Sequence, residues 1–477
     1  MAPKASTYTT LNYQSVTLIK SISGFRGTIG GKSGNAFTPL DIVKFTAAFA
    51  SWAKAKNPQN QTIVIGRDAR LSGEMVSKIV SGTLQSMGFN VLDLGLSTTP
   101  TVEIAVPTEG AAGGIILTAS HNPIQWNALK LLNANGEFIS AQDGAEVLEI
   151  ADNETFEFVD VRKVGSYSQD SSYLQKHIEA ILALPLVDKA VVEARNFRIA
   201  VDAVNSTGGI AVPMLLEALG VQKVKLINCE PTGNFAHNPE PLPENLTEIC
   251  REIKEGEYDL GIVVDPDVDR LALISEDGEP FGEEYTLVAV ADYVLKNTKG
   301  NTVSNLSSTI ALRDVTRKHG GEHHAAAVGE VNVVEKMKAV GAVIGGEGNG
   351  GVIYPELHYG RDALVGIALF LTHLAKFGKS PSFLRQHYPS YFISKNKIEL
   401  TPDIDVDEVL LKIQKRYAKH PINTEDGVKI EFGQEWVHLR KSNTEPIIRI
   451  YSESDFMAKA ENLAKKIIAD IREVIKS

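Results

Sequence analysis

The alternation of apolar runs with amphipathic stretches predicts a chain in which strands and helices follow one another. An apolar run at 62–66 leads into a polar loop at 67–72 and then into a helical pattern over 74–87. Gly88 ends that pattern, because glycine accepts the left-handed conformation that closes helices, and a second strand follows at 90–94. The same order returns twice, at 198–227 and more weakly at 303–328, so the chain repeats one unit.

Strands that alternate with helices predict parallel sheets with right-handed crossovers. The last part of the chain differs, since 396–477 predicts a strand, a helix over about 405–418, three further strands and a helix at 457–476. The expected fold is therefore three similar α/β domains with mixed or parallel sheets and a C-terminal α+β domain around a central cleft. The expected divisions are an N-terminal extension (1–15) and domains at 16–165, 166–280, 281–390 and 391–477.

Each of the three repeats closes with an apolar strand that runs into a distinctive polar loop. These loops are Thr118-Ala119-Ser120-His121-Asn122-Pro123, Asp265-Pro266-Asp267-Val268-Asp269-Arg270 and Gly346-Glu347-Gly348-Asn349-Gly350-Gly351. The carboxyl ends of parallel strands are where α/β proteins place their sites. We therefore expect the three loops to meet at one cleft.

The aspartate loop suits a divalent cation. Asp265, Asp267 and Asp269 stand at i, i+2 and i+4, and in an extended segment such side chains share one face. Carboxylates that crowd together raise one another's pKa, and a hard cation such as Mg²⁺ removes the conflict. Arg270 adds a phosphate-binding fork beside the metal.

The same loop allows another chemistry, in which Asp265 is the nucleophile of an aspartyl-phosphate phosphatase and Asp267 its acid. The symmetry of the three loops favours Ser120 as the phosphoryl carrier and the aspartates as metal ligands. Lys130 lies on a predicted strand that returns past Ser120, where its amine would act as an acid/base or stabilise charge. Arg26 stands between glycines and is either a phosphate contact or a turn residue.

Two further segments predict ligand contacts. Glu347 in its glycine-rich loop is expected to grip ligand hydroxyls, because glycines allow a close approach. The dinucleotide fingerprint Gly346-x-Gly348-x-x-Gly351 is rejected, since no helix is predicted directly after it. Arg440-Lys441-Ser442-Asn443-Thr444-Glu445-Pro446 joins two predicted strands, and with Arg449 it is typical of an anion site.

The amino-acid composition limits the kinds of partner that the protein is expected to bind. The net charge of −11 argues against a nucleic-acid ligand, but it leaves room for a small phosphorylated molecule in a locally basic pocket. No apolar run approaches the roughly 18 residues that a membrane span needs, and no secretory signal is evident. Two cysteines without metal spacing fit a reduced, cytoplasmic location.

Taken together and in this order, the loops around Ser120, Asp265, Glu347 and Arg440 resemble the α-D-phosphohexomutase superfamily. The resemblance implies that Ser120 is a phosphoserine that shares Mg²⁺ with the three aspartates, and that a hexose 1,6-bisphosphate is the intermediate and activator. It also implies catalytic roles near the transferred phosphate for Arg26, His121 and Lys130, and substrate binding by Arg270, Glu347, Asn349, Arg440, Ser442, Asn443, Thr444 and Arg449.

The resemblance leaves the sugar open. Bacterial phosphoglucosamine mutases and many phosphomannomutase/phosphoglucomutases usually carry serine where Asn349 stands and histidine where Gly351 stands. The preferred reaction is the interconversion of glucosamine 6-phosphate and glucosamine 1-phosphate, with phosphomannomutase/phosphoglucomutase as the alternative. An aspartyl-phosphate sugar phosphatase and a non-catalytic sugar-phosphate sensor are the less favoured hypotheses. The expected assembly is a monomer or homodimer without membrane or nucleic-acid partners.

Overall fold

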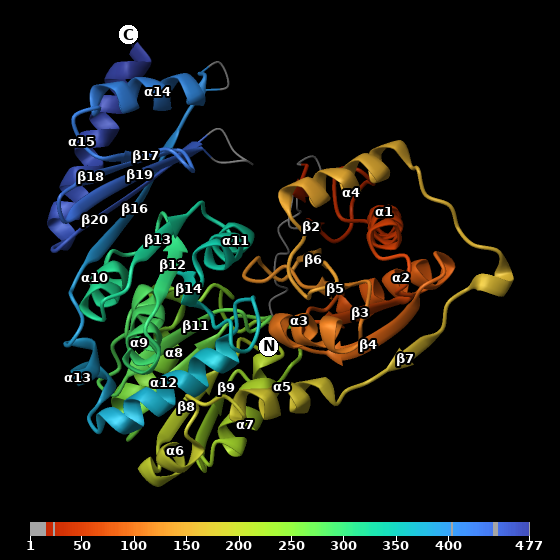
Figure 1. Ribbon diagram of the computed structural model, residues 1–477, viewed down its shortest axis with the longest axis horizontal. Helices are drawn as coiled ribbons and strands as arrows, with labels where there is room; N and C mark the ends of the chain where they lie inside the picture. Colours follow the sequence, from red (N-terminus) through yellow and green to blue (C-terminus); the bar gives the residue numbers. More distant parts are fainter. Residues whose placement is uncertain (1–15, 22–23, 402–403, 442–446, 477) are drawn as a thin grey trace, which may run out of the picture.

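The computed structural model describes residues 16–21, 24–401, 404–441 and 447–476, and these residues form four sheets with their helices (Figure 1). The predicted fold class is confirmed: three α/β domains are followed by a C-terminal α+β domain. The predicted domain boundaries remain predictions. None of the described helices is both long enough and apolar enough to cross a membrane.

The first domain is built on a mixed sheet of strand order β1-β2-β6-β5-β3-β4-β7. Helices α1, α2 and α4 pack on one face against side chains such as Ile63 and Ile115, and α3 covers the other face against Val64 and Ile116. Alternate residues of one strand thus serve two cores. The elements are β1 (Ile19–Ser21), β2 (Gly24–Thr28), α1 (Pro39–Lys56), β3 (Thr62–Arg67), α2 (Gly73–Ser86), β4 (Asn90–Leu96), α3 (Thr99–Thr108), β5 (Gly113–Leu117), β6 (Trp126–Leu132), α4 (Ala141–Asn153), η1 (Val161–Lys163) and β7 (Tyr167–Gln169).

The second domain repeats the centre of the first. Its sheet has the order β11-β10-β8-β9, with β8, β9 and β10 parallel and β11 antiparallel. This matches β6-β5-β3-β4 of the first sheet in order and direction. The elements are α5 (Tyr173–Leu182), α6 (Lys189–Arg195), β8 (Arg198–Asp202), α7 (Gly208–Ala218), β9 (Lys223–Ile227), η2 (Pro243–Asn245), α8 (Thr247–Glu255), β10 (Leu260–Val264) and β11 (Leu271–Ser275).

The third domain has the same arrangement in the order β15-β14-β12-β13, with β15 as the antiparallel strand. The sequence repeat is therefore a structural repeat, and each polar loop follows the equivalent strand: β5, β10 or β14. The elements are α9 (Glu283–Asn297), β12 (Asn301–Asn305), α10 (Ala311–Lys318), β13 (His323–Ala326), α11 (Glu330–Val340), β14 (Ala342–Glu347), β15 (Gly351–Ile353), α12 (Ala363–Phe377) and α13 (Pro381–Arg385).

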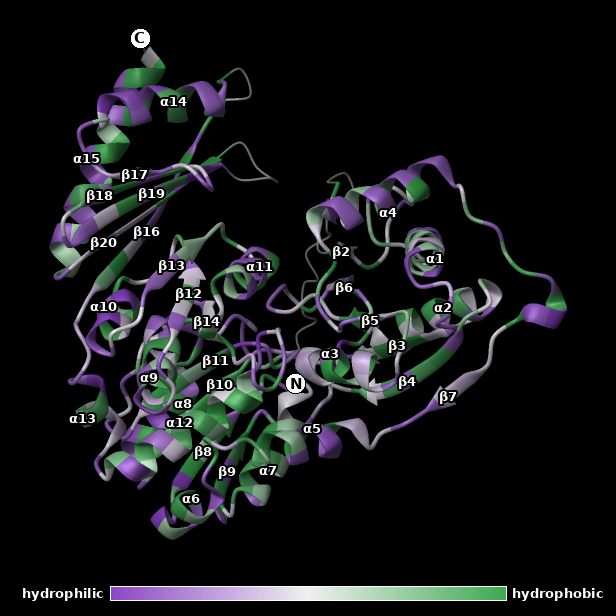
Figure 2. Ribbon diagram, viewed as in Figure 1, coloured by the Kyte–Doolittle hydropathy of each residue, from purple (hydrophilic) through white to green (hydrophobic). Residues whose placement is uncertain are grey.

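The second and third domains share one hydrophobic core. A continuous cluster of buried side chains runs from β8, β10 and α7 into α9, α12 and β14, and includes Leu215, Ile262, Val288 and Phe370. In Figure 2, β8, β10 and α7 are largely green, as expected for elements that are buried. Apolar burial therefore fixes the loop after β10 relative to the loop after β14.

The fourth domain is an antiparallel sheet of order β16-β20-β19-β18-β17 with α14 and α15 packed on it. Its buried side chains, among them Ile413, Ile450 and Ile467, form a cluster of their own. The predicted order of strands and helices is confirmed, with an additional short strand, β17. The elements are β16 (Phe392–Glu399), α14 (Val406–Arg416), β17 (Ile422–Asn423), β18 (Val428–Phe432), β19 (Glu435–Lys441), β20 (Ile447–Ser454) and α15 (Met457–Lys476).

Candidate active site

Side chains from the first three domains meet at the aspartate loop after β10. The Ser120 hydroxyl donates to Asp265 Oδ2 over 2.8 Å, and the Thr99 hydroxyl donates to Asp267 Oδ2 over 2.6 Å. From the third domain, Arg361 Nη2 donates to Asp269 Oδ2 over 2.6 Å. The serine loop and the aspartate loop thus meet as expected, and the Leu271 N–H, at the end of the aspartate loop, donates to Gly350 O of the glycine-rich loop over 3.1 Å.

The three aspartates are buried and can bring one oxygen each to within 4.8 Å of the others. The geometry that produces this cluster differs from the prediction. The segment is a turn rather than extended backbone: Val268 N donates to Asp265 O over 3.1 Å, and Val268 has a φ of +63°. A β-branched residue rarely adopts this left-handed conformation, so the loop is strained. The turn, not strand alternation, gathers the carboxylates.

The electrostatics of the cluster fit a bound cation. Burial, together with Asp269 and Asp267, raises the pKa of Asp265 well above its ordinary value. Burial opposes ionisation of Asp269 as well, but Arg361, Lys130 and Arg270 lower its pKa. Asp267 Oδ1 and Asp269 Oδ1 are buried without a hydrogen-bond partner among the described residues. Unpartnered carboxylate oxygens in a buried cluster are donors that a divalent cation would satisfy.

Lys130 lies on β6, on the strand that was predicted to return past Ser120. Its ammonium contacts the aspartates, at 2.7 Å from Asp267 Oδ2 and 3.3 Å from Asp269 Oδ2. Burial opposes its charge, yet Asp267 and Asp269 raise the pKa of Lys130, so it stays protonated. Lys130 also lines a cavity of about 60 Å³ together with Arg26 and Ser120. The amine is thus placed to stabilise negative charge beside Ser120.

Three further predicted residues surround the serine with positive or neutral nitrogen atoms. Arg26 Nε is buried with no hydrogen-bond partner in the described chain, and burial together with Arg270 lowers the pKa of Arg26. His121 Nδ1 lies 3.4 Å from Ser120 Oγ, and burial followed by repulsion from Arg270 lowers its pKa to about 2. Arg270 Nε lies 3.7 Å from Asp269 Oδ1. An anion would satisfy these guanidinium groups.

One arginine that sequence reasoning missed holds the serine loop in place. The Arg70 side chain is fully buried and donates to the backbone carbonyls of Ser120 and Asn122, each over 2.6 Å. It donates as well to the carbonyls of Pro123 and Trp126 and pairs with Asp68 over 3.0 Å. Ser120 has a φ of +47°, so this clamp maintains a conformation that the backbone would otherwise avoid.

Glu347, the last residue of β14, is held in a fixed orientation. Its Oε1 accepts from Asn305 Nδ2 over 2.9 Å and from the Gly329 N–H over 3.2 Å, and its Oε2 accepts from Arg361 over 2.8 Å. The Asn349 side chain turns back on its own loop, where its Oδ1 accepts from the Gly351 N–H over 3.2 Å. Arg361 was not predicted from the sequence.

The predicted anion site lies on the fourth domain. Arg440 on β19 and Arg449 on β20 stand directly opposite each other in the sheet, an arrangement of like charges that an anion would relieve. Arg440 Nε pairs with Asp426 Oδ2 over 2.6 Å. The predicted residues Ser442, Asn443 and Thr444 lie outside the described residues.

Comparison with family models matches this chain to all four parts of one family. The models are those of phosphoglucomutase/phosphomannomutase: alpha/beta/alpha domain I over residues 18–158, domain II over 175–278, domain III over 282–391 and the C-terminal domain over 401–470.

Individual relatives agree with the models. A phosphoglucomutase/phosphomannomutase of Thermococcus kodakarensis is 34% identical over 456 residues, which cover 94% of this chain and 99% of the relative. A phosphoglucosamine/phosphogalactosamine mutase of Sulfurisphaera tokodaii is 31% identical, with 95% and 98% covered. The crystal structure of a phosphoglucomutase/phosphomannomutase family protein from Burkholderia thailandensis has a TM-score of 0.82 at 25% identity, with 96% and 97% covered.

Proposed function

The chain belongs to the phosphoglucomutase/phosphomannomutase family and is a phosphohexomutase, and we propose that it interconverts glucosamine 6-phosphate and glucosamine 1-phosphate. The observation that carries the catalytic assignment is the buried Ser120 hydroxyl, which contacts Asp265 and shares a cavity with Arg26 and Lys130. The choice of sugar rests on relatives named as phosphoglucosamine mutases.

The proposed reaction consists of two phosphoryl transfers, one from Ser120 to the sugar and one from the sugar back to Ser120. In the first, the bond between phosphorus and Ser120 Oγ breaks while a bond to a sugar hydroxyl forms; the sugar hydroxyl loses its proton, and Ser120 Oγ takes one up. The resulting 1,6-bisphosphate turns end for end. In the second step, the bond between its other phosphorus and the sugar oxygen breaks while a bond to Ser120 Oγ forms. Ser120 Oγ loses its proton, the sugar oxygen takes one up, and the product is released.

Each side chain has a role that suits its surroundings. Lys130 and Arg26 stabilise the negative charge of the phosphoryl group during its transfer. His121, kept neutral by burial, is placed to share a hydrogen bond with Ser120 Oγ. Mg²⁺ held by Asp265, Asp267, Asp269 and a phosphoserine oxygen would supply positive charge at the transferred group.

Substrate binding is proposed for the other predicted residues. Glu347 and Asn349 would contact sugar hydroxyls, and Arg270 would contact the phosphate near Ser120. The phosphate that is not transferred would be held by Arg440, Ser442, Asn443, Thr444 and Arg449. The proposed form of the protein is a cytoplasmic monomer or homodimer.

The test of the carrier combines mass spectrometry with activity. Isolated protein is expected to carry one phosphoryl group on Ser120, and Ser120→Ala is expected to lose mutase activity. Ser166→Ala, at an exposed serine, is the matched control and should keep both properties. Full activity of Ser120→Ala would refute the assignment and would favour an Asp265 nucleophile.

The test of the sugar is a coupled assay across glucosamine, glucose, mannose and N-acetylglucosamine 1-phosphates, with the matching bisphosphate as activator. The highest kcat/KM is expected for glucosamine 1-phosphate. A preference for glucose or mannose would instead support the second candidate, phosphomannomutase/phosphoglucomutase, which the 34% identical relative favours.

A further inference from the structure

We propose that Arg361 is a positioning residue that orients Glu347 for the sugar by tying it to the aspartate loop, and that Gly351 is needed to let the Arg361 side chain through. The proposal rests on the function proposed above and adds to it a residue that sets how the sugar is held. Arg361 lies between β15 and α12, and its side chain is 9% exposed.

A single guanidinium joins three elements. Arg361 Nη1 donates to Glu347 Oε2 over 2.8 Å, and Nη2 donates to Asp269 Oδ2 over 2.6 Å. Its Nε donates to Glu330 Oε2 over 3.1 Å, and its backbone N–H donates to the other oxygen of that carboxylate. The planar fork of arginine satisfies such an arrangement, whereas the point charge of a lysine ammonium does not.

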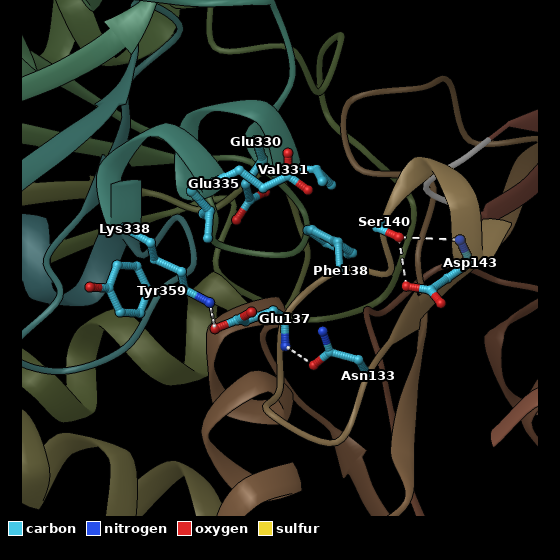
Figure 3. A pocket seen from close by; sticks show the side chains of 11 residues that line it. Asn133, Glu137, Phe138, Ser140, Asp143, Glu330, Val331, Glu335, Lys338 and Tyr359 are labelled. Carbon is cyan, nitrogen blue, oxygen red and sulfur yellow. Dashed lines mark hydrogen bonds and ion pairs between the residues drawn. The ribbon is translucent and has the colours of Figure 1, made fainter. Parts of the chain in front are cut away.

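Arg361 is fixed both through the next residue of the backbone and through the helix that carries its partner Glu330. The next residue, Asp362, caps α12 by accepting from the Leu364 N–H over 2.8 Å. Glu330 begins α11, and Lys338 on the same helix pairs with Glu137 of the first domain (Figure 3). Arg361 therefore reaches Glu347 from a rigid support.

The absence of a side chain at Gly351 leaves the space that the Arg361 side chain occupies. A Cβ at position 351 would lie 2.4 Å from Arg361 Cδ, closer than real contacts allow. The requirement is steric, since the backbone of Gly351 is outside the left-handed region. Gly351 pairs with Glu347 across β14 and β15, so a displaced Arg361 would lose its contact at that point.

The consequence for binding concerns the free acceptor positions of Glu347. Asn305 and Gly329 hold one oxygen, and Arg361 holds the other. A carboxylate has about four acceptor positions, so one remains for a sugar hydroxyl, with its direction set by these three donors. Loss of the arginine contact would let the carboxylate turn and would weaken the grip on the sugar.

The experiment compares two ligands on protein freed of metal with EDTA. Arg361→Lys is expected to weaken binding of glucosamine 6-phosphate by about tenfold, as for a lost charge-assisted hydrogen bond, and to leave the affinity for inorganic phosphate unchanged. Calorimetry measures both. Arg416→Lys, at an arginine paired with Asp470 and Glu473 on the fourth domain, is the matched control and should change neither.

Two further variants separate positioning from folding. Gly351→Ala keeps the arginine and should reproduce the selective loss, and it serves if Arg361→Lys does not fold. In a Glu347→Gln background, Arg361→Lys should cause little further loss, because both changes act on the same contact. Equal weakening of both ligands, or no weakening of either, would overturn the proposal. Failure of the wild type to bind the 6-phosphate of glucosamine, glucose, mannose or N-acetylglucosamine would instead refute the proposed function.

Discussion

The proposed metal end of the site, at the aspartate loop, and the proposed phosphate end, at Arg440 and Arg449, are supported in different ways. At the metal end, Ser120, Asp265 and Arg361 come from three domains, and the second and third of these share one apolar core. The phosphate end lies on the fourth domain, whose described core is separate. Figure 1 shows the fourth domain beside the third, adjoining β13 and α10.

Polar contacts join the third and fourth domains, whose described hydrophobic clusters are separate. Lys429 Nζ donates to Leu306 O over 2.7 Å, Ser307 and His438 share a hydrogen bond of 2.9 Å, and the Val328 N–H donates to Asp426 over 2.9 Å. Hydrogen bonds across a boundary exchange with water at a small net cost, whereas a shared apolar core does not. We therefore expect the proposed metal end to be the more rigid of the two, and the proposed phosphate end to adjust more easily to a substrate that binds in two orientations.

The largest effect is expected from metal removal. Treatment with EDTA followed by gel filtration should abolish mutase activity, because the crowded carboxylates lose their counter-charge, and added Mg²⁺ should restore it. The rate before and after addition measures this. Activity that persists at full rate in EDTA would show that the metal end needs no divalent cation.

The second largest effect is expected from a substitution that loosens the loop that carries Ser120. Arg70→Met leaves four carbonyls and Asp68 without their buried partner, so kcat should fall by about a hundredfold and stability by about 3–5 kcal/mol. Steady-state kinetics and thermal melting measure the two losses. Arg162→Met, at an exposed arginine, is the control; an equal loss there would contradict the special role of the clamp.

A change at the phosphate end should affect binding rather than transfer. Arg440→Met should raise KM by about tenfold with kcat reduced much less, because it removes a contact made throughout the reaction. The melting temperature should stay within about 2 °C of wild type. A large fall in kcat with an unchanged KM would contradict the assigned division between the two ends.

The smallest expected effect is a dependence of stability on pH that arises from Lys429, at the boundary between the third and fourth domains. Burial lowers the pKa of Lys429 from 10.5 to about 8, so between these values the unfolded chain binds more protons than the folded one. Stability contributed by this site should therefore rise as pH increases from 8 to 10.5. The melting temperature of wild type relative to Lys429→Met should increase over that interval, on the order of 2 °C. A flat or falling difference would contradict the buried neutral amine, and Lys412→Met is a surface control.

Residues in local motifs could be predicted from the sequence, and residues defined by distant partners could not. Ser120 and the aspartates follow apolar strands, so their position at the sheet edge was predictable. Arg70 acts on a loop 50 residues away and Arg361 on an aspartate 92 residues away, and neither has a local pattern that sets it apart from a surface arginine.

The backbone conformation that brings the three aspartates together could not be predicted from the sequence pattern either. Spacing at i, i+2 and i+4 suggested an extended segment, but the left-handed Val268 makes a turn, a conformation that a valine does not suggest. Lys130 was expected to reach Ser120, and its described contacts are with Asp267 and Asp269. Which of several nearby acceptors a lysine selects depends on how the domains pack together.

The core that the second and third domains share bears on how this chain can be divided. A cut near residue 280 would expose the apolar surface that includes Leu215, Ile262 and Val288 on both fragments. Each half should then aggregate unless the other is present. A cut near residue 390 would cross mainly hydrogen bonds and ion pairs and leave each fragment with its own core. Three domains of related architecture thus do not amount to three independent folding units, and the C-terminal domain is the piece most readily exchanged between members of the family.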